Sequence, residues 1–291
     1  MNSLISNRYI QTAYRKLLHQ IGDRQAGTNV FSRDWDCCIV LDACRYDLME
    51  TVASDYESLQ NLDSIWSVDS KTHAWLEKTV KGTSAETLER TAYVTGNPFS
   101  DYVLDDNPFG TLDEVWRYAW DDDLGTVRPR PITDRAIRIG RTSDFDRLLI
   151  HYMQPHVPFL DWEERQPLQM GNFGAEKQAV RDTWGRFRDG EVEEEDVWRA
   201  YRRNLKIALD DIELLLNNLD ATETIITSDH GNGMGEWGIY GHPLHMPFEP
   251  LRKVPWIQTT ARDQQTHTPE EYEATTDETS IEDRLAALGY K

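Results

Sequence analysis

Carboxylate and imidazole side chains follow the ends of several strand-like runs in this 291-residue sequence. Carboxylate oxygens combined with imidazole nitrogens suit zinc, manganese or iron better than a site built of oxygen alone. The pattern therefore predicts a site for a divalent metal, with zinc or manganese favoured and calcium or magnesium as alternatives. The candidate ligands for the metal or for an ester are Asp42, His156, Asp229, His230 and His242.

The two acidic candidates are placed by the runs that precede them. Asp42 follows the continuous apolar run 37–41, and Asp229 follows the β-branched run 222–228. Open α/β sheets bind their ligands at the carboxyl ends of the strands, so both acids are expected at one edge of a sheet. The alternative for Asp42 is an acid that caps the next helix, a role that stabilises by about 1 kcal/mol.

The rest of the chain alternates helix-like and strand-like patterns, as an α/β domain requires. The periodicity predicts helices over 6–20, 133–140, 197–219 and 281–288, and further strands over 92–95, 147–152 and 254–257. The polar segment 161–195 is expected to be a substrate-side lid or a flexible insertion, and 261–280 a loosely ordered acidic tail. We therefore expect one domain over 1–291, with its core over roughly 36–258.

The charge of the chain excludes two classes of partner. The 51 acidic residues outnumber the 31 basic ones and give a net charge of −20, so the surface repels nucleic acids and anionic membranes. Only 8 of the basic residues are lysines and the acids are spread along the whole chain, which is typical of halophilic proteins. An ordinary acidic protein is the alternative. We expect no nucleic-acid partner and no membrane partner, and the oligomeric state stays open.

The location is interpreted from the N-terminus and the cysteines. Residues 1–22 contain no apolar run of signal-peptide length, and no stretch approaches the roughly 18 apolar residues of a membrane span. The three cysteines, Cys37, Cys38 and Cys44, are an odd number that does not close into a disulfide framework, which favours a reducing compartment. We therefore expect a soluble, cytoplasmic protein.

Three motifs together resemble the alkaline phosphatase superfamily and, within it, the sulfatase-like and phosphoglycerol-transferase-like branch. They are Val-Leu-Asp-Ala-Cys-Arg-Tyr-Asp at 40–47, His-Tyr-Met-Gln-Pro-His-Val-Pro-Phe at 151–159, and Thr-Ser-Asp-His-Gly at 227–231 with Gly-Glu at 235–236 and Tyr-Gly-His-Pro at 240–243. Their order and spacing match over most of the chain. The resemblance implies an α/β fold, a three-layer sandwich with a mixed, mostly parallel central sheet.

The resemblance also implies a metal and a nucleophile. Asp42, Asp229 and His230 are expected to hold one metal ion, which the attacking oxygen of a Ser, Thr or modified Cys also touches. The matching position is Thr72, 30 residues after Asp42 and at the start of a predicted helix, where a developing anion is stabilised. A bound cation lowers the pKa of a coordinated hydroxyl, so Thr72 can attack an ester and form a covalent intermediate.

Two other hydroxyls compete with Thr72 for the nucleophile role. The stretch Ser-Val-Asp-Ser-Lys-Thr at 67–72 offers three hydroxyls within six residues. Ser70 is the stronger alternative, and Ser67 is the weaker one.

The residues expected on the substrate side carry cations or imidazoles. His156 and His242 match positions that bind a second metal in the superfamily or contact the ester oxygens and the leaving group. Lys71 is expected to steady an anionic ester unless it is simply solvated, and Arg45 can reach a phosphate bidentately unless it pairs with a nearby carboxylate. His151, by contrast, is interpreted as a hydrogen-bonded core histidine.

Three departures from the superfamily pattern limit the prediction. The formylglycine signature Cys-x-Pro-x-Arg is absent, so an ordinary sulfatase is disfavoured and a Thr nucleophile points to phosphate esters. Gln154 stands where many relatives carry Asp, and Asn232 stands where many carry Glu. Both changes remove a negative charge near the cation, so we expect one tightly bound metal and at most a loosely bound second one.

The sequence therefore supports one leading function and two alternatives. The leading function is a metal-dependent hydrolase or transferase of phosphate or sulfate esters, with a Thr or Ser nucleophile and a small-molecule or glycan-linked substrate, phosphate being favoured. One alternative is a sulfatase-like hydrolase of sulfuric esters. The other, of a different class, is a catalytically degenerate binding protein on the same fold.

Overall fold

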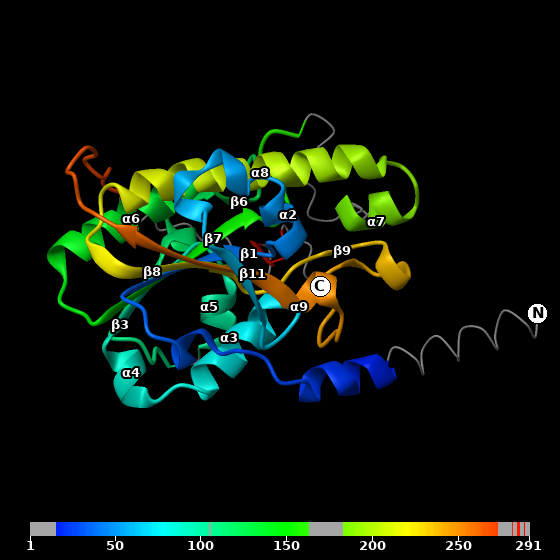
Figure 1. The fold of residues 1–291 in the computed structure, drawn as a ribbon, viewed down its shortest axis with the longest axis horizontal. Coiled ribbons are helices and arrows are strands. Elements are labelled where there is room, and N and C mark those ends of the chain that lie inside the picture. The colour runs from blue at the N-terminus through cyan, green and yellow to red at the C-terminus, as the bar shows by residue number, and fades with distance from the viewer. Residues whose placement is uncertain are drawn as a thin grey trace, which may run out of the picture.

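A seven-stranded sheet forms the centre of the computed structural model, which describes residues 16–104, 106–162, 183–272 and the single positions 281, 284, 285 and 288 (Figure 1). From one edge to the other the strands are β2 (Leu62–Trp66), β11 (Lys253–Ala261), β8 (Ala221–Ser228), β1 (Cys37–Asp42), β7 (Arg147–Pro155), β3 (Thr91–Thr95) and β4 (Thr111–Glu114). Two short hairpins lie outside this sheet: β5 (Trp120–Asp121) with β6 (Thr126–Val127), and β9 (Gly233–Met234) with β10 (Tyr240–Gly241).

The central sheet is mostly parallel. β1 pairs in parallel with β7 and β8, and β3 pairs in parallel with β7 and β4, whereas β11 is antiparallel to both β8 and β2. Every residue of β1 is buried, because helices cover both faces of the sheet. Successive residues of β1 point to opposite faces: Ile39 and Leu41 enter one hydrophobic cluster, and Cys38 and Val40 enter the other.

Helices on the two faces make this a three-layer sandwich, as predicted (Figure 1). The face that buries Ile39 and Leu41 carries α2 (Tyr46–Glu50), α6 (Pro129–Thr142) and α8 (Glu194–Leu216). The opposite face carries α3 (Thr72–Lys81) and α4 (Ala85–Glu89), with α5 (Phe99–Val103) beside α3. Further helical segments are 16–24, α7 (Thr183–Arg188), α9 (Glu249–Arg252) and five 3-10 turns at Val30–Ser32, Ala53–Asp55, Glu57–Leu59, Val115–Arg117 and Glu236–Gly238.

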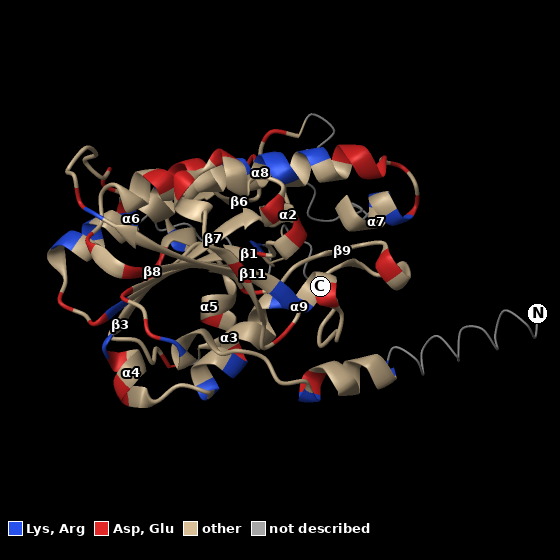
Figure 2. Ribbon diagram, viewed as in Figure 1, with Lys and Arg blue, Asp and Glu red and all other residues tan. Residues whose placement is uncertain are grey.

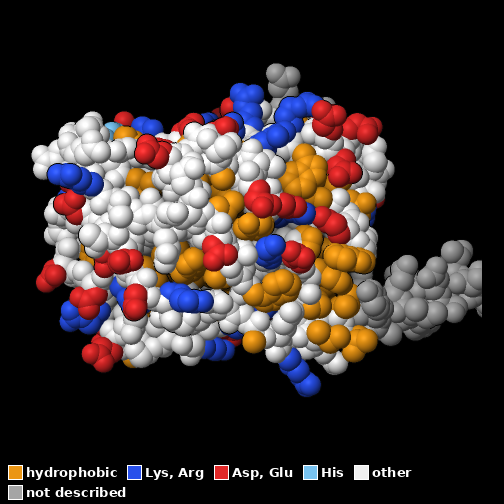
Figure 3. All heavy atoms as spheres, in the orientation of Figure 1, with side chains coloured by type: hydrophobic (Ala, Val, Ile, Leu, Met, Phe, Trp, Pro, Cys, Tyr) orange, Lys and Arg blue, Asp and Glu red, His pale blue; other side chains and the backbone are white. Residues whose placement is uncertain are grey.

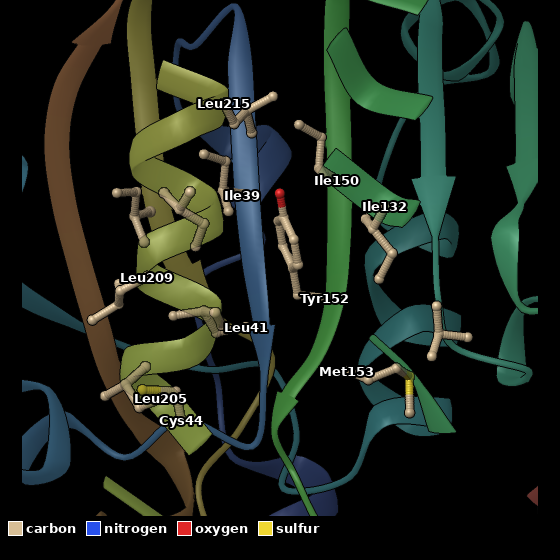
Figure 4. Close-up of a cluster of buried hydrophobic side chains, with 14 of the residues drawn as sticks. Ile39, Leu41, Cys44, Ile132, Ile150, Tyr152, Met153, Leu205, Leu209 and Leu215 are labelled. Atoms are coloured by element: carbon tan, nitrogen blue, oxygen red, sulfur yellow. The ribbon is translucent and has the colours of Figure 1, made fainter. Parts of the chain in front are cut away.

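The helix α8 supplies much of the larger cluster, because its apolar residues recur at helical spacing and form one stripe. Figure 4 shows Leu205, Leu209 and Leu215 of this stripe facing Ile39 and Leu41. Burying each leucine contributes about 1.5–3 kcal/mol, and this packing holds the sheet whose strand ends carry the polar motifs.

The sequence predicted most of these elements, with differences in the irregular segments. The stretch 97–132, which lacks a clear period, contains β4 and the β5–β6 hairpin. The first part of the expected acidic tail, 262–272, is held in place rather than loosely ordered. The backbone N–H of Arg262 bonds to the carbonyl of Leu216, and the side chains of His267 and Tyr272 bond to Asp134. Most of the predicted helices 6–20 and 281–288, the residues 163–182 of the expected insertion and the tail residues 273–280 lie outside the described residues.

The surface carries interspersed charges. Figure 2 shows acidic and basic residues alternating along α8 and clustered on loops, and Figure 3 shows hydrophobic side chains gathered toward the right-hand side of the visible face. Across the described ranges no helix is both long and apolar enough to cross a membrane.

Candidate metal centre and active site

The carboxyl ends of three adjacent strands bring the polar motifs together. Leu41 of β1 lies opposite Ser228 of β8, so the next residues, Asp42 and Asp229, emerge side by side. On the other side Asp42 pairs with Pro155 of β7, and its carbonyl accepts a hydrogen bond from the backbone N–H of His156 at 3.0 Å. The prediction that these motifs meet at one edge of the sheet agrees with this geometry.

Asp42, Asp229 and His230 form a compact buried group. One potential ligand atom from each lies within 4.8 Å of the others, and all three residues are fully buried. The Nε2 atom of His230 is 3.7 Å from Oδ1 of Asp42 and 3.4 Å from Oδ2 of Asp229. His242 lies beside this group, with its ring centroid 4.8 Å from that of His230.

Each carboxylate is anchored through one oxygen only. Oδ1 of Asp229 accepts the backbone N–H groups of Ala43 at 2.9 Å and His230 at 2.8 Å, and Oδ2 of Asp42 accepts the side-chain amide of Asn97 at 2.7 Å. The other two oxygens, Oδ1 of Asp42 and Oδ2 of Asp229, have no hydrogen-bond partner within the described part of the chain. These are the two oxygens that face Nε2 of His230.

The electrostatics of this group favour a cation. Burial, together with the neighbouring Asp229, raises the pKa of Asp42 well above its ordinary value. Two buried carboxylates with no cation beside them are costly, because each loses its hydration without a compensating charge. The two orphaned oxygens and the imidazole nitrogen fit a divalent metal, and this mixed donor set matches zinc or manganese.

In three histidines the Nδ1 atom makes a hydrogen bond that leaves Nε2 as the atom with the lone pair. Nδ1 of His230 donates to the carbonyl of Gly231 at 2.9 Å, Nδ1 of His156 donates to the carbonyl of Val157, and Nδ1 of His242 bonds to Oδ1 of Asn232 at 2.7 Å. A neutral imidazole that donates through Nδ1 carries its lone pair on Nε2. Such a second hydrogen bond is how metal-binding histidines are oriented.

Burial keeps two of these imidazoles neutral. Desolvation lowers the pKa of His156 to about 4, and desolvation followed by repulsion from His230 and His156 lowers the pKa of His242 well below its ordinary value. The ring centroids of His156 and His242 are 4.9 Å apart. The two rings can therefore act at neutral pH as lone-pair donors or proton acceptors rather than as cations.

Thr72 is buried at the start of α3, against the candidate metal ligands. Its Oγ1 lies 3.1 Å from Nε2 of His230, and its hydroxyl offsets part of the rise in the pKa of Asp42. The first N–H groups of a helix have no partner within the helix, so they favour an anion beside Thr72. The hydroxyls of Ser67 and Ser70 are used elsewhere: the first donates to the carbonyl of Asp229 and the second to that of Pro243.

The two predicted substrate cations differ in the structure. Lys71 is half-buried, desolvation lowers its pKa, and its charge lowers the pKa of His156 and His242, which places it near both rings. Arg45 is instead bonded to groups of the protein, as in the alternative that pairs it with a nearby carboxylate. Its guanidinium bonds bidentately to Asp47 at 2.7 and 2.6 Å, to Glu236 at 2.7 Å and to the carbonyl of Asn232 at 2.9 Å.

His151 is the core histidine that its position predicted. It is fully buried, Nδ1 bonds to the hydroxyl of Tyr93 at 3.1 Å, and burial lowers its pKa to about 4. Its Nε2 lies 3.9 Å from Oδ2 of Asp229, directly behind the metal-binding group. The two uncharged residues near the site make structural hydrogen bonds. Gln154 bonds to the carbonyl of Val127, and Asn232 bonds to His242.

Two contributors to the site were missed in the sequence. Asn97 holds Asp42, and its position two residues after the strand run 92–95 was the available signal. Ala43 has a left-handed backbone with φ of 60°, which points its N–H at Asp229, while its carbonyl accepts from the hydroxyl of Tyr201. An alanine in this conformation leaves no mark in the sequence.

The chain is similar in fold to several solved structures. No protein-family model and no curated protein sequence matches it. An integral membrane protein, lipooligosaccharide phosphoethanolamine transferase A from Neisseria meningitidis, is 13% identical with a TM-score of 0.50, over 84% of this chain and 50% of that chain. The soluble domain of the same transferase is 13% identical with a TM-score of 0.49, over 87% and 86% of the two chains. BT4656, solved with its substrate D-glucosamine-2-N,6-O-disulfate, is 14% identical with a TM-score of 0.51, over 89% and 77%.

These likenesses show the fold. The chain has the fold of the alkaline phosphatase superfamily, as the three motifs predicted, and this fold carries enzymes such as transferases and sulfatases. The chain spans half the length of the full phosphoethanolamine transferase from Neisseria meningitidis.

The expectation of a cytoplasmic location is wrong. The full transferase from Neisseria meningitidis, with a TM-score of 0.50 to this chain, is an integral membrane protein, and two further transferase domains, from Campylobacter jejuni and Escherichia coli, are described as periplasmic. The three cysteines from which we inferred a reducing compartment are all buried. Burial raises the pKa of each thiol and shields it from solvent, so these residues do not report the redox state of a compartment.

Proposed function

We propose that this protein is a metal-dependent hydrolase or transferase of phosphate esters with Thr72 as its nucleophile. One observation carries the proposal. The two carboxylate oxygens without partners, on Asp42 and Asp229, face Nε2 of His230, and the Thr72 hydroxyl lies 3.1 Å from that same nitrogen. A cation site and a buried hydroxyl at a helix N-terminus thus lie in contact.

The proposed ligands of the metal are Asp42, Asp229, His230 and His242. A bound zinc or manganese ion would supply positive charge that acidifies a nearby hydroxyl and neutralises the ester oxygens. Asn97 and the Ala43 N–H hold the two carboxylates in place, and the Nδ1 bonds of the histidines fix their Nε2 lone pairs.

Thr72 would attack the phosphorus as its hydroxyl proton leaves. The bond between Oγ1 and phosphorus forms while the bond from phosphorus to the leaving oxygen breaks, and the leaving oxygen takes up the proton that Thr72 lost. Water or an acceptor alcohol then attacks the phosphothreonine and restores the hydroxyl. His156 would accept the proton of that second nucleophile and return it to Oγ1, and Lys71 would balance the charge of the ester.

Phosphate is favoured over sulfate because no cysteine is placed to serve as a modified nucleophile. Cys37 and Cys38 lie within β1 and are fully buried, and the sulfur of Cys44 bonds to the carbonyl of Arg45 at 3.6 Å. The Thr72 hydroxyl, by contrast, lies beside the candidate metal ligand His230. The similar structures, a phosphoethanolamine transferase and a protein bound to a sulfated sugar, support the broader class of phosphate and sulfate esters.

Turnover by the metal-loaded protein tests the proposal. Purified protein would be loaded with zinc or manganese and assayed on an aryl phosphate, an aryl phosphodiester and an aryl sulfate, with Thr72→Ala as the matched control. We expect turnover of a phosphate ester that falls by roughly a thousandfold or more in Thr72→Ala. Faster turnover of the sulfate would favour the sulfatase alternative. Metal binding without turnover of any ester would support the binding-protein alternative and contradict the proposal.

An acceptor alcohol separates hydrolase from transferase. Glycerol would be added to the assay, and the yields of glycerol phosphate and inorganic phosphate compared. Glycerol phosphate formed in preference to inorganic phosphate identifies a transferase, and inorganic phosphate alone identifies a hydrolase.

A further inference from the structure

We propose that Asp69 and Ser70 are positioning residues that clamp the nucleophile-bearing segment to the loop that carries His242. This inference rests on the proposed function. The clamp joins 69–70 to 243–246, two segments more than 170 residues apart in the chain. It fixes where Thr72 lies relative to His242.

Asp69 provides one half of the clamp. Its carboxylate is fully buried, and Oδ1 accepts the backbone N–H of Ser70 at 2.7 Å and that of His245 at 3.1 Å. Oδ2 accepts Nδ1 of His245 at 2.6 Å and the ammonium of Lys78 at 2.8 Å. One carboxylate therefore holds both the backbone and the ring of His245.

Ser70 provides the other half. Its hydroxyl donates to the carbonyl of Pro243 at 2.7 Å and accepts the backbone N–H of Met246 at 2.8 Å. Four hydrogen bonds thus join the two segments, and each involves a side chain of Asp69 or Ser70. The Ser70 hydroxyl, which competed with Thr72 for the nucleophile role, is occupied in the clamp at both its donor and acceptor sites.

The clamp lies next to the reacting groups on both sides. Thr72 follows Ser70 by two residues and is the first residue of α3, so the clamp sets the position of the helix start. His242 immediately precedes Pro243. Small displacements matter here, because a misplacement of about 1 Å in a reacting pair can cost about a hundredfold in rate.

The backbone of His245 indicates that this loop is held rather than relaxed. His245 has φ of 54°, in the left-handed region, which is unfavourable for a residue other than glycine. Such a conformation persists only where its surroundings determine it, and the two bonds to Asp69 do so. The ring of His19, 4.5 Å away in an edge contact, packs against the same imidazole.

The group Asp23, Asp69 and His245 has metal-like spacing but is satisfied by a side chain. The ammonium of Lys78 bonds to Asp69 at 2.8 Å and to Asp23 at 2.9 Å, so the positive charge required there is already supplied. The carboxylate of Asp69 therefore serves to position the loop. Among the described residues Lys78 bonds to Asp23 and Asp69 and makes no hydrogen bond to 243–246, which makes it a suitable control.

Variants that remove the clamp can be compared with variants that preserve it. Ser70→Ala deletes two of the four bonds, and His245→Gly deletes the ring bond while tolerating the left-handed backbone. His245→Asn is the rescue variant, because asparagine tolerates that backbone and retains an amide donor for Asp69. Lys78→Met removes the ion pair and leaves all four bonds between the segments.

Each metal-loaded variant would be assayed for kcat and KM on the ester that the wild type turns over, with metal content and amide hydrogen exchange measured on the same samples. We expect Ser70→Ala and His245→Gly to lower kcat by tenfold or more, with KM within about threefold, metal content unchanged and faster exchange of the His245 and Met246 amides. Lys78→Met and His245→Asn should keep kcat within about threefold of the wild type.

Three results would overturn the inference. One is wild-type kcat in Ser70→Ala despite faster amide exchange, which would make the clamp merely structural. Another is a decrease in kcat in Lys78→Met as large as the decrease in Ser70→Ala. The third is complete loss in Ser70→Ala with full activity in both Thr72→Ala and His245→Gly, which would identify Ser70 as the nucleophile. If the wild type turns over no ester, the proposed function fails first, and the amide exchange still reports whether the clamp exists.

Discussion

The hydroxyl oxygen of Thr72 lies 3.1 Å from Nε2 of His230, although 158 residues separate them in the chain. Thr72 starts a helix on one face of the sheet, whereas His230 follows the end of a central strand. Their contact joins a candidate nucleophile to a candidate metal ligand. The predictions below follow from this contact and from the groups that hold it.

A covalent intermediate should form on Thr72. Brief reaction with a phosphate ester, followed by an acid quench, should leave a phosphoryl group on the peptide that contains Thr72, as detected by mass spectrometry. Thr72→Ser should still be labelled, because it keeps a hydroxyl at the same place, and Thr72→Ala should not. Label on Ser70 instead would reject Thr72 as the nucleophile.

Asn97 should tune the affinity for the metal without being a ligand. Its amide donates to Asp42 at 2.7 Å, so Asn97→Ala leaves that carboxylate free to turn away from the cation. We expect metal affinity to fall by about 10–100-fold in a chelator competition. Asn218→Ala is the control, since this equally buried asparagine bonds to Arg141 and His267. Equal losses of affinity in the two variants would argue against the orienting role.

The metal-free protein should lose stability on acidification because of His151. Burial lowers its pKa from 6.5 to about 4, so below pH 6.5 the unfolded chain binds a proton that the folded protein does not. Stability is therefore full above pH 6.5 and falls as the pH drops through 4, by about 3 kcal/mol from this residue. Urea unfolding of the wild type and of His151→Gln across this range should show a shallower pH slope in the variant. The same pH dependence of the unfolding free energy in both proteins would contradict the role of His151.

Salt should stabilise the fold. With a net charge of −20 the folded surface repels itself, and added ions screen that repulsion. We expect Tm to rise steadily with KCl between low salt and molar concentrations. Potassium glutamate at the same ionic strength should act similarly, and a Tm that is flat or falls in both salts would leave the chain an ordinary acidic protein.

The sequence predicted those parts of the site that depend on strand ends. Asp42, Asp229 and His230 directly follow long apolar or β-branched runs, and parallel pairing necessarily brings such ends to one edge. The superfamily resemblance then pointed to Thr72. These inferences needed only local pattern and order along the chain.

The parts of the site that the sequence did not predict depend on tertiary contacts that no local pattern encodes. Arg45 could be assigned to a phosphate or to carboxylates with equal reason until Glu236 and Asn232 were found beside it. Asn97, which bonds to Asp42 across 55 residues, and the clamp at Asp69 likewise depend on contacts between distant parts of the chain. The weakly periodic stretch that contains β4 was missed because its four residues pair at the sheet edge and show no strong alternation.

The most direct test of the account is the metal content of purified wild type and Asp229→Ala, measured beside phosphate-ester turnover on the same samples. Asp229 supplies one of the two unpartnered oxygens, so we expect bound zinc or manganese in the wild type and loss of both metal and turnover in the variant. Wild-type protein that binds no divalent metal, or a variant that keeps full turnover, would contradict the proposed metal centre.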